Sequence, residues 1–148
     1  MKVALAFDHA GVPLRDAVLA AVEAAGDEPI DFGVRSTEPV DYPDVAEKVS
    51  RAVSQGLADR GVLVCGSGAG VSVAANKHNG IRAAVIHDEY TAHQAVEHDD
   101  VNVLCLGARV VGEELARELV ARFLAAEFSG EERHARRLEK VQRIEDAN

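Results

Sequence analysis

The chain has 148 residues, of which 47% are hydrophobic, and this is the usual size of one domain with a buried core. We therefore expect residues 1–148 to form a single domain. Twenty-five acidic residues against 16 basic ones give a formal charge of -9, which argues against nucleic acid or a membrane as a partner. The sequence shows neither a signal peptide nor an apolar run near ~18 residues, so we expect a cytoplasmic protein.

Five short apolar runs alternate with segments that are long enough for helices, which is the rhythm of strand-helix-strand units. The runs cover residues 2–7, 28–32, 61–65, 82–86 and 101–106. Strands that are almost wholly apolar are usually covered on both faces, as in a parallel sheet between two layers of helices. The pattern therefore predicts the α/β class.

Apolar residues at helical spacing predict three of the intervening helices. The first has Pro13 near its start and Gly26 just past its end, and the second opens at Pro43. The three apolar stripes are Leu14, Val18, Ala21, Val22 and Ala25; Ala46, Val49, Val53 and Leu57; and Leu115, Leu119, Val120 and Phe123. We expect all three to lie against the sheet.

A further helix is predicted at the C-terminus, because Ser129 and Glu132 have the spacing of a capping box. This helix carries five Arg and Lys residues, and its apolar stripe is too narrow for ordinary core packing. The stripe consists of Leu138, Val141 and Ile144. We interpret it as a helix that docks on a partner subunit, with a solvated terminal helix held by charge pairs as the alternative.

The residues that follow each strand are the first candidates for a site, because ligands of open α/β sheets lie beyond the carboxyl ends of the strands. Four of the five predicted strands are followed by polar residues or glycine. These are Asp8, His9 and Gly11; residues 65–70; His87 and Asp88; and Gly107 and Arg109. We therefore expect polar groups to converge at this edge of the sheet.

The glycine-rich segment from Gly66 to Gly70 joins a predicted strand to a predicted helix. Its backbone amides, with the helix dipole behind them, are suited to hold a phosphate or an oxyanion. A dinucleotide-binding turn needs glycine where the chain has Val71, and a Walker loop needs its lysine closer than Lys77. A merely tight turn is the alternative.

Cys65 ends a predicted strand and opens this loop, where helix-terminal amides favour the ionised form of a thiol. That position suits a base or a nucleophile, although a strand cysteine can equally be a small core residue. Cys105 has no glycine loop beside it and is assigned to packing. We expect both thiols to be reduced, and their spacing suits no zinc site.

Other candidate residues are less specific. Asp8 and His9 could hold sugar hydroxyls, belong to a metal site or form a structural turn, but no third metal ligand is well spaced. His98, which precedes the last strand, could act as an acid or a base near neutral pH. Arg133 and Arg137 could clamp a phosphate together, unless they belong to a solvated charge run.

Seven short blocks carry a resemblance that covers essentially the whole chain. They are Asp8-His9-Ala10-Gly11, Asp41-Tyr42-Pro43, Cys65-Gly66-Ser67-Gly68, Ala74-Ala75-Asn76-Lys77, Gly80-Ile81-Arg82-Ala83, Gly107-Ala108-Arg109-Val110-Val111-Gly112 and Arg133-His134. In this order they resemble the type B ribose-5-phosphate isomerase family, which also includes the paired subunits of galactose-6-phosphate isomerase.

The resemblance implies a Rossmann-like α/β/α sandwich with a five-stranded parallel sheet, assembled as a homodimer or tetramer. It implies aldose-ketose isomerisation of a sugar phosphate through a cis-enediolate, without metal or other cofactor. Cys65 would move the proton between C1 and C2, Ser67 would hold the enediolate oxygen, and His98 would open the furanose ring. The implied substrate ligands are Asp8, His9, Tyr42, Gly66, Gly68, Ala69, Gly70, Asp99, Arg109, Arg133 and Arg137.

One departure from the family concerns the substrate. Relatives commonly have Asn after the ring-opening histidine, where this chain has Asp99, and a carboxylate accepts hydrogen bonds but donates none. Ribose 5-phosphate is the expected substrate, with allose, galactose or tetrulose phosphates as alternatives. The alternatives from other classes are a nucleotide-binding Rossmann-like domain and a non-catalytic sugar-phosphate sensor.

The strand directions predict a site that is shared between subunits. Cys65 lies at the carboxyl end of its strand, whereas His98 precedes the amino end of another parallel strand. Since a strand of this length spans ~17–20 Å, the two side chains should lie at opposite edges of the sheet. If both act on one sugar, the simplest arrangement is a twofold dimer in which each cleft takes Cys65 from one chain and His98 from the other.

Overall fold

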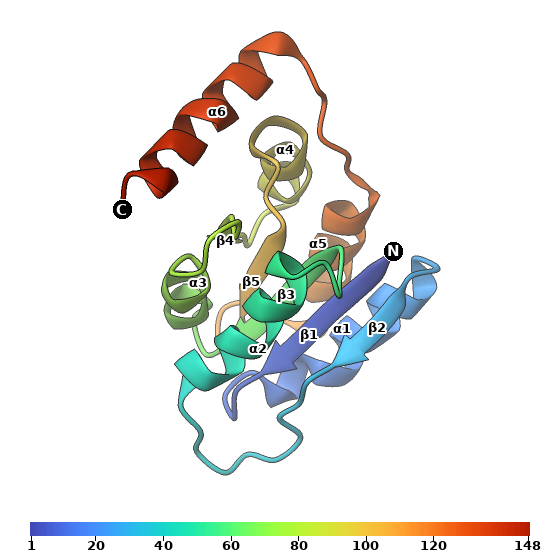
Figure 1. Cartoon of the computed structure of the whole chain (residues 1–148). Coiled ribbons are helices and arrows are strands. Elements are labelled where there is room, and N and C mark those ends of the chain that lie inside the picture. Colours follow the sequence, from blue (N-terminus) through green and yellow to red (C-terminus); the bar gives the residue numbers. More distant parts are fainter.

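A five-stranded, fully parallel sheet forms the centre of the computed structural model, which describes residues 1–148 (Figure 1). Its strands are β1 (Lys2–Phe7), β2 (Glu28–Asp31), β3 (Arg60–Cys65), β4 (Ala83–Val85) and β5 (Val103–Gly107). Their order in the sheet is β2-β1-β3-β5-β4. The predicted α/β class and the five-stranded parallel sheet are therefore confirmed.

Helices cover both faces of the sheet and make a three-layer sandwich (Figure 1). They are α1 (Arg15–Ala24), α2 (Tyr42–Ser54), α3 (Ala69–Ala75), α4 (Glu89–Asp99), α5 (Glu113–Ala125) and α6 (Glu132–Asp146), with a single 3-10 turn, η1 (Val12–Leu14), before α1. Helices α1, α4 and α5 pack on one face, and α2 and α3 pack on the other. None of the helices is long and apolar enough to cross a bilayer.

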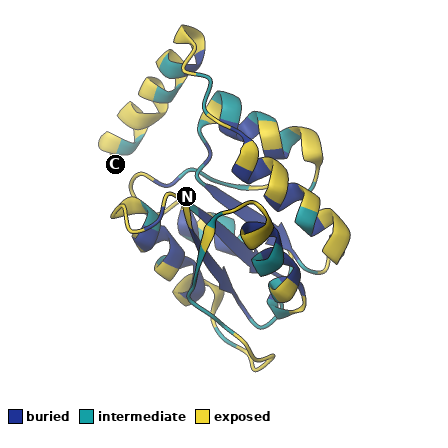
Figure 2. Ribbon diagram, turned by 90° about the vertical axis from the view of Figure 1, so that its right-hand side faces the viewer, coloured by how far each residue is buried: buried dark blue, intermediate teal, exposed yellow.

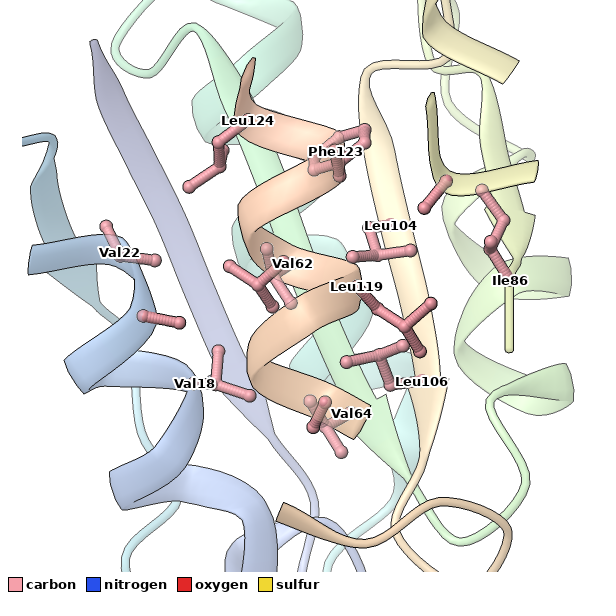
Figure 3. Packing of buried hydrophobic residues seen from close by; sticks show 14 of the residues in the cluster. Val18, Val22, Val62, Val64, Ile86, Leu104, Leu106, Leu119, Phe123 and Leu124 are labelled. Carbon is pink, nitrogen blue, oxygen red and sulfur yellow. The ribbon is translucent and has the colours of Figure 1, made fainter. Parts of the chain in front are cut away.

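Side chains alternate along each strand and so supply two separate cores. Val62, Val64, Leu104 and Leu106 point toward α1 and α5 (Figure 3). The intervening strand residues, among them Cys65, point toward α2 and α3. Helix α5 contributes fully buried residues such as Phe123, and burying a side chain of that size stabilises the fold by about 1.5–3 kcal/mol.

The predicted helical stripes are correct in their centres, but some of their end residues are exposed. Val18, Val49 and Leu119 are fully buried, as expected. Leu57 is 60% exposed, because α2 ends at Ser54 and the chain has already turned away from the sheet. Apolar periodicity thus located the core-facing side of each helix, but the stripes of α1 and α2 continued past the last turn.

Helix α6 stands apart from the sandwich and is exposed over most of its surface (Figure 2). His134 is its only buried residue, and Val141 and Ile144 are 50% and 66% exposed. The predicted capping box is wrong, because Glu131 is the N-cap and makes no side-chain capping bond. The hydroxyl of Ser129 lies 2.6 Å from Nδ1 of His134 instead, so a tertiary contact replaces the local cap.

Candidate active site

A cleft of about 400 Å³ lies at the carboxyl ends of β1, β3 and β5. Its lining residues are Asp8, His9, Ala10, Tyr42, Cys65, Gly66, Ser67, Gly70, Arg109 and Val110. All of them except Ala10 and Val110 were predicted site residues. The two additional residues carry no polar side chain, and nothing in their residue types would have distinguished them.

The thiol of Cys65 is held at the start of α3 by a backbone amide. Cys65 is 5% exposed, and the N–H of Gly68 donates a hydrogen bond to its Sγ at 3.1 Å. Gly68 has φ +82°, and a Cβ there would lie 3.1 Å from the carbonyl carbon of Leu106, so the turn requires glycine. Because an N–H that donates to sulfur stabilises the thiolate, the site is suited to a thiolate base.

Cys105, in the neighbouring strand, is a core packing residue. It is fully buried, and burial raises the pKa of the Cys105 thiol far above its ordinary value, with the neighbouring Cys65 adding to the effect. The Cys105 thiol therefore stays protonated. Cys105 also does not line the cleft. Both cysteines are free thiols, as predicted.

Gly107 fixes the position of Ser67 through close backbone contact. A Cβ on Gly107 would lie only 2.7 Å from the carbonyl carbon and oxygen of Ser67. The N–H of Gly107 donates to Nε2 of His87 at 2.9 Å, which requires that nitrogen to be unprotonated. Burial lowers the pKa of His87 and so favours this neutral form. The loop that follows β3 is therefore supported by the end of β5.

Asp8 and His9 are each held by backbone amides. The carboxylate of Asp8 accepts hydrogen bonds from the N–H groups of Ala10 and Gly11, both at 2.9 Å. His9 Nδ1 accepts from the N–H of Val40 at 3.1 Å, which leaves Nε2–H for a ligand. Asp8 thus forms a structural turn, which was one of its predicted roles, and it also lines the cleft.

Tyr42 and Arg109 each pack against the loop that carries Ser67. The ring of Tyr42 lies against Gly70, where a Cβ would come within 3.0 Å of it. Arg109 reaches Gly66, where a Cβ would lie 3.3 Å from Nη1 of the guanidinium. Both side chains are exposed enough to meet a ligand. No group of three or more His, Cys, Asp or Glu side chains in the chain is arranged to hold a metal ion.

Gly68 and Ala69 lie between the lining residues Ser67 and Gly70, but the other four predicted site residues lie elsewhere. His98 and Asp99 occupy the last turn of α4, and none of His98, Asp99, Arg133 and Arg137 lines the cleft. Asp99 and Arg137 instead line a second hollow of about 430 Å³ beneath α6. Since Cys65 pairs with Gly107 at the carboxyl ends of β3 and β5, one chain places its candidate residues at two ends of the sheet.

His98 has neighbours that sequence reasoning did not assign to the site. Its ring stacks on that of His134, with ring centroids 4.1 Å apart and an angle of 25° between the planes. Gln94 lies 3.0 Å from Nδ1 of His98. His134 was part of the last of the seven blocks, but no local pattern indicates a contact between α4 and α6.

The fold defines a Rossmann-like α/β enzyme with a cleft at the carboxyl edge of its sheet, where the amide of Gly68 contacts the thiol of Cys65. The chain belongs to the Ribose/Galactose Isomerase family, whose sequence model matches residues 3–141. The predicted family is therefore confirmed.

Individual relatives are similar over nearly their whole length. Ribose-5-phosphate isomerase B of Escherichia coli (strain K12) is 44% identical over 144 residues, which cover 97% of this chain and 96% of that protein. D-erythrulose-4-phosphate isomerase of Pectobacterium atrosepticum is 39% identical over 132 residues, or 88% and 86% of the two chains. The structure of type B ribose 5-phosphate isomerase from Trypanosoma cruzi is 43% identical, covers 100% of both chains and gives a TM-score of 0.97.

Proposed function

We propose that this aldose-ketose isomerase converts D-ribose 5-phosphate to D-ribulose 5-phosphate in the cytoplasm. The observation that carries the proposal is the amide-bound thiol of Cys65 in a cleft with Ser67 and Arg109. The relatives named for ribose 5-phosphate support this substrate. Another sugar phosphate is the alternative, and a relative named for erythrulose 4-phosphate favours keeping a tetrose in the tests.

In the proposed reaction the Cys65 thiolate removes the proton from C2 of the open-chain aldose. The electrons move onto O1, a proton passes from O2 to O1, and the thiol returns its proton to C1 to give the ketose. Ser67 Oγ accepts a hydrogen bond from the N–H of Ala69 at 3.2 Å, which leaves its O–H free to donate to the enediolate. A donor placed where negative charge develops typically contributes about 3 kcal/mol.

Hydrogen-bond donors around the cleft are proposed to hold the phosphate. His9 presents Nε2–H, Arg109 presents its guanidinium, and both residues line the cleft. In this arrangement Asp8 and Tyr42 are left for the sugar hydroxyls. Gly68 holds the thiol, and the neighbouring amides of Ala69 and Gly70 lie in the first turn of α3.

We propose further that a partner subunit supplies the other half of the site in a dimer. The residues proposed to open the ring and to complete the phosphate site, His98, Asp99, Arg133 and Arg137, lie outside the cleft. Exposed apolar residues lie near both halves, since Val73 on α3 is 61% exposed and Ile144 on α6 is 66% exposed. A twofold dimer that buries these residues would bring α6 of one chain to the cleft of the other.

The activity is tested with a panel of four- to six-carbon sugar phosphates and two cysteine variants. Cys65→Ala should abolish turnover and keep sugar-phosphate binding, whereas Cys105→Ala should keep full activity. A sugar-phosphate sensor would show no turnover at all and would be indifferent to the loss of the Cys65 thiol. Turnover by Cys65→Ala at the wild-type rate would refute the proposed base.

The shared site is tested by refolding two inactive variants together. A hybrid of Cys65→Ala and His98→Asn chains contains one intact site and one doubly altered site if the two residues come from different subunits. With random pairing, half of the dimers are hybrids, so about a quarter of the wild-type activity should return. Verified hybrids without activity would place both residues in the same chain's site.

A further inference from the structure

The first turn of α6 contacts the last turn of α4 through the stacked rings of His98 and His134. His134 is 2% exposed, although it lies on a helix whose other residues are all partly or fully exposed. Ser129 connects the two helices, because its N–H donates to the carbonyl of Glu97 at 2.9 Å and its hydroxyl lies 2.6 Å from Nδ1 of His134. The contact is therefore built from buried and hydrogen-bonded groups.

Hydrogen bonds leave one nitrogen of His98 for a ligand. The side-chain amide of Gln94 lies 3.0 Å from Nδ1. An amide can donate to an unprotonated Nδ1 or, turned over, accept from a protonated one, so this partner fits both charge states of the ring. Nε2 is then the nitrogen that can exchange a proton with a substrate.

The charge on His134 is also restricted by its surroundings. Burial lowers the pKa of His134, and the nearby His98, Arg133 and Arg137 lower it further, while Glu131 acts in the opposite direction. His134 is therefore held neutral. Because two charged rings in a stack would repel each other, a neutral His134 lets the ring of His98 take up and release a proton without that repulsion.

We propose that His134 is a positioning residue that holds the ring of His98 for proton transfer to a cyclic sugar phosphate. The proposal rests on the function proposed above, in which His98 opens the furanose. In that step the C1–O4 bond breaks and O4 takes the proton from Nε2 of the charged ring. The hydroxyl proton of O1 passes to water, and His98 regains a proton from water.

The test compares a reaction that needs ring opening with reactions that do not. Ribose 5-phosphate is largely a furanose. An aldotetrose 4-phosphate cannot form one because its O4 is blocked, and ribulose 5-phosphate cannot because its O5 is blocked. Conversion of the tetrose, and exchange of the C1 hydrogen of ribulose 5-phosphate for deuterium, therefore report proton transfer by Cys65 alone.

His134→Leu should lower kcat for ribose 5-phosphate on the order of 10- to 100-fold with little change in KM, since a reacting group displaced by ~1 Å can cost a factor of 100. Both ring-independent reactions should keep nearly wild-type rates. His134→Phe, which retains a flat ring, should restore most of the loss. Ser129→Ala, which removes the partner of Nδ1, should lose activity in the same selective way but to a smaller extent.

His93→Leu is the matched control, because His93 is an exposed histidine on the same helix and pairs only with Glu97. It should leave all three reactions unchanged. Equal losses in the cyclic and the ring-independent reactions of His134→Leu would show a general structural role and overturn the proposal, as would undiminished activity. If His134→Leu does not fold, Ser129→Ala and His134→Phe decide the question. A wild-type protein without isomerase activity would instead refute the proposed function, before any variant is compared.

Discussion

Replacing Gly107 with alanine tests whether the position of Ser67 controls the reaction. The added Cβ would lie 2.7 Å from the Ser67 carbonyl carbon and oxygen, whereas ordinary contact begins at 3.4 Å, so the loop must move by about 0.7 Å (3.4 − 2.7). The clash is with backbone, which cannot rotate away as a side chain would. We expect a stability loss of about 1–3 kcal/mol, as for other overpacked sites.

The effect of Gly107→Ala on catalysis should exceed its effect on stability. A shift approaching 1 Å in a group that stabilises the transition state can cost on the order of 100-fold in rate. We expect kcat for sugar-phosphate isomerisation to fall by about that factor while the thermal unfolding transition remains cooperative. The matched control is Gly112→Ala at the start of α5, where a Cβ meets nothing within 4 Å.

The control should keep its activity and lose at most about 1 kcal/mol of stability, because alanine is a poorer N-cap residue than glycine. Both variants are measured by steady-state kinetics on the preferred sugar phosphate and by thermal unfolding. If Gly107→Ala folds and retains wild-type kcat, Ser67 does not hold the enediolate oxygen in the position proposed here.

Three further predictions concern substrate choice, phosphate binding and pH. Asp99→Asn should change the ratio of kcat/KM between five-carbon and other sugar phosphates. An unchanged ratio across the panel would show that Asp99 does not control substrate choice. Arg137→Gln should weaken binding of phosphorylated sugars but not the weak binding of free sugars, as measured by calorimetry; equal losses would indicate a structural role. Burial lowers the pKa of folded His87 below that of the unfolded chain, so the unfolded state binds more protons and stability should fall as the pH drops below about 6.5. His87→Gln, which keeps an acceptor for Gly107 but does not titrate, should show a shallower fall in denaturant titrations, and an identical pH dependence would refute this role.

The sheet and its functional edge were predictable because both depend on local sequence. Residues 3–7, for example, are all apolar, and that composition is typical of a strand covered on both faces. Parallel strands also bring their carboxyl ends to one edge, so the residues after β1, β3 and β5 had to meet there. This geometric rule placed Asp8, Cys65 and Arg109 in one cleft without any knowledge of their contacts.

The surroundings of His98 were not predictable in this way, because they depend on where α6 returns to the body of the protein. Ser129 and Glu132 satisfy the spacing of a capping box, and only the nearby imidazole of His134 explains why the hydroxyl is used elsewhere. Similarly, α4 has no pattern that indicates a stacked ring beside His98. Local rules fail at these residues because a tertiary contact competes with the local hydrogen bond.

The distribution of charge gives a physical reason for the cationic residues of α6, a helix that stands away from its own sheet. A chain with a net charge of -9 repels an anionic sugar phosphate unless positive potential is concentrated near the cleft. On α6, Arg133 pairs with Glu131 and Arg136 pairs with Glu132, while Arg137 faces the hollow that Asp99 also lines. Helix α6 of a partner chain, placed over the cleft, would add positive charge to that supplied by Arg109. The same docking would cover exposed apolar residues of α6 such as Ile144, so one contact would serve both assembly and substrate binding.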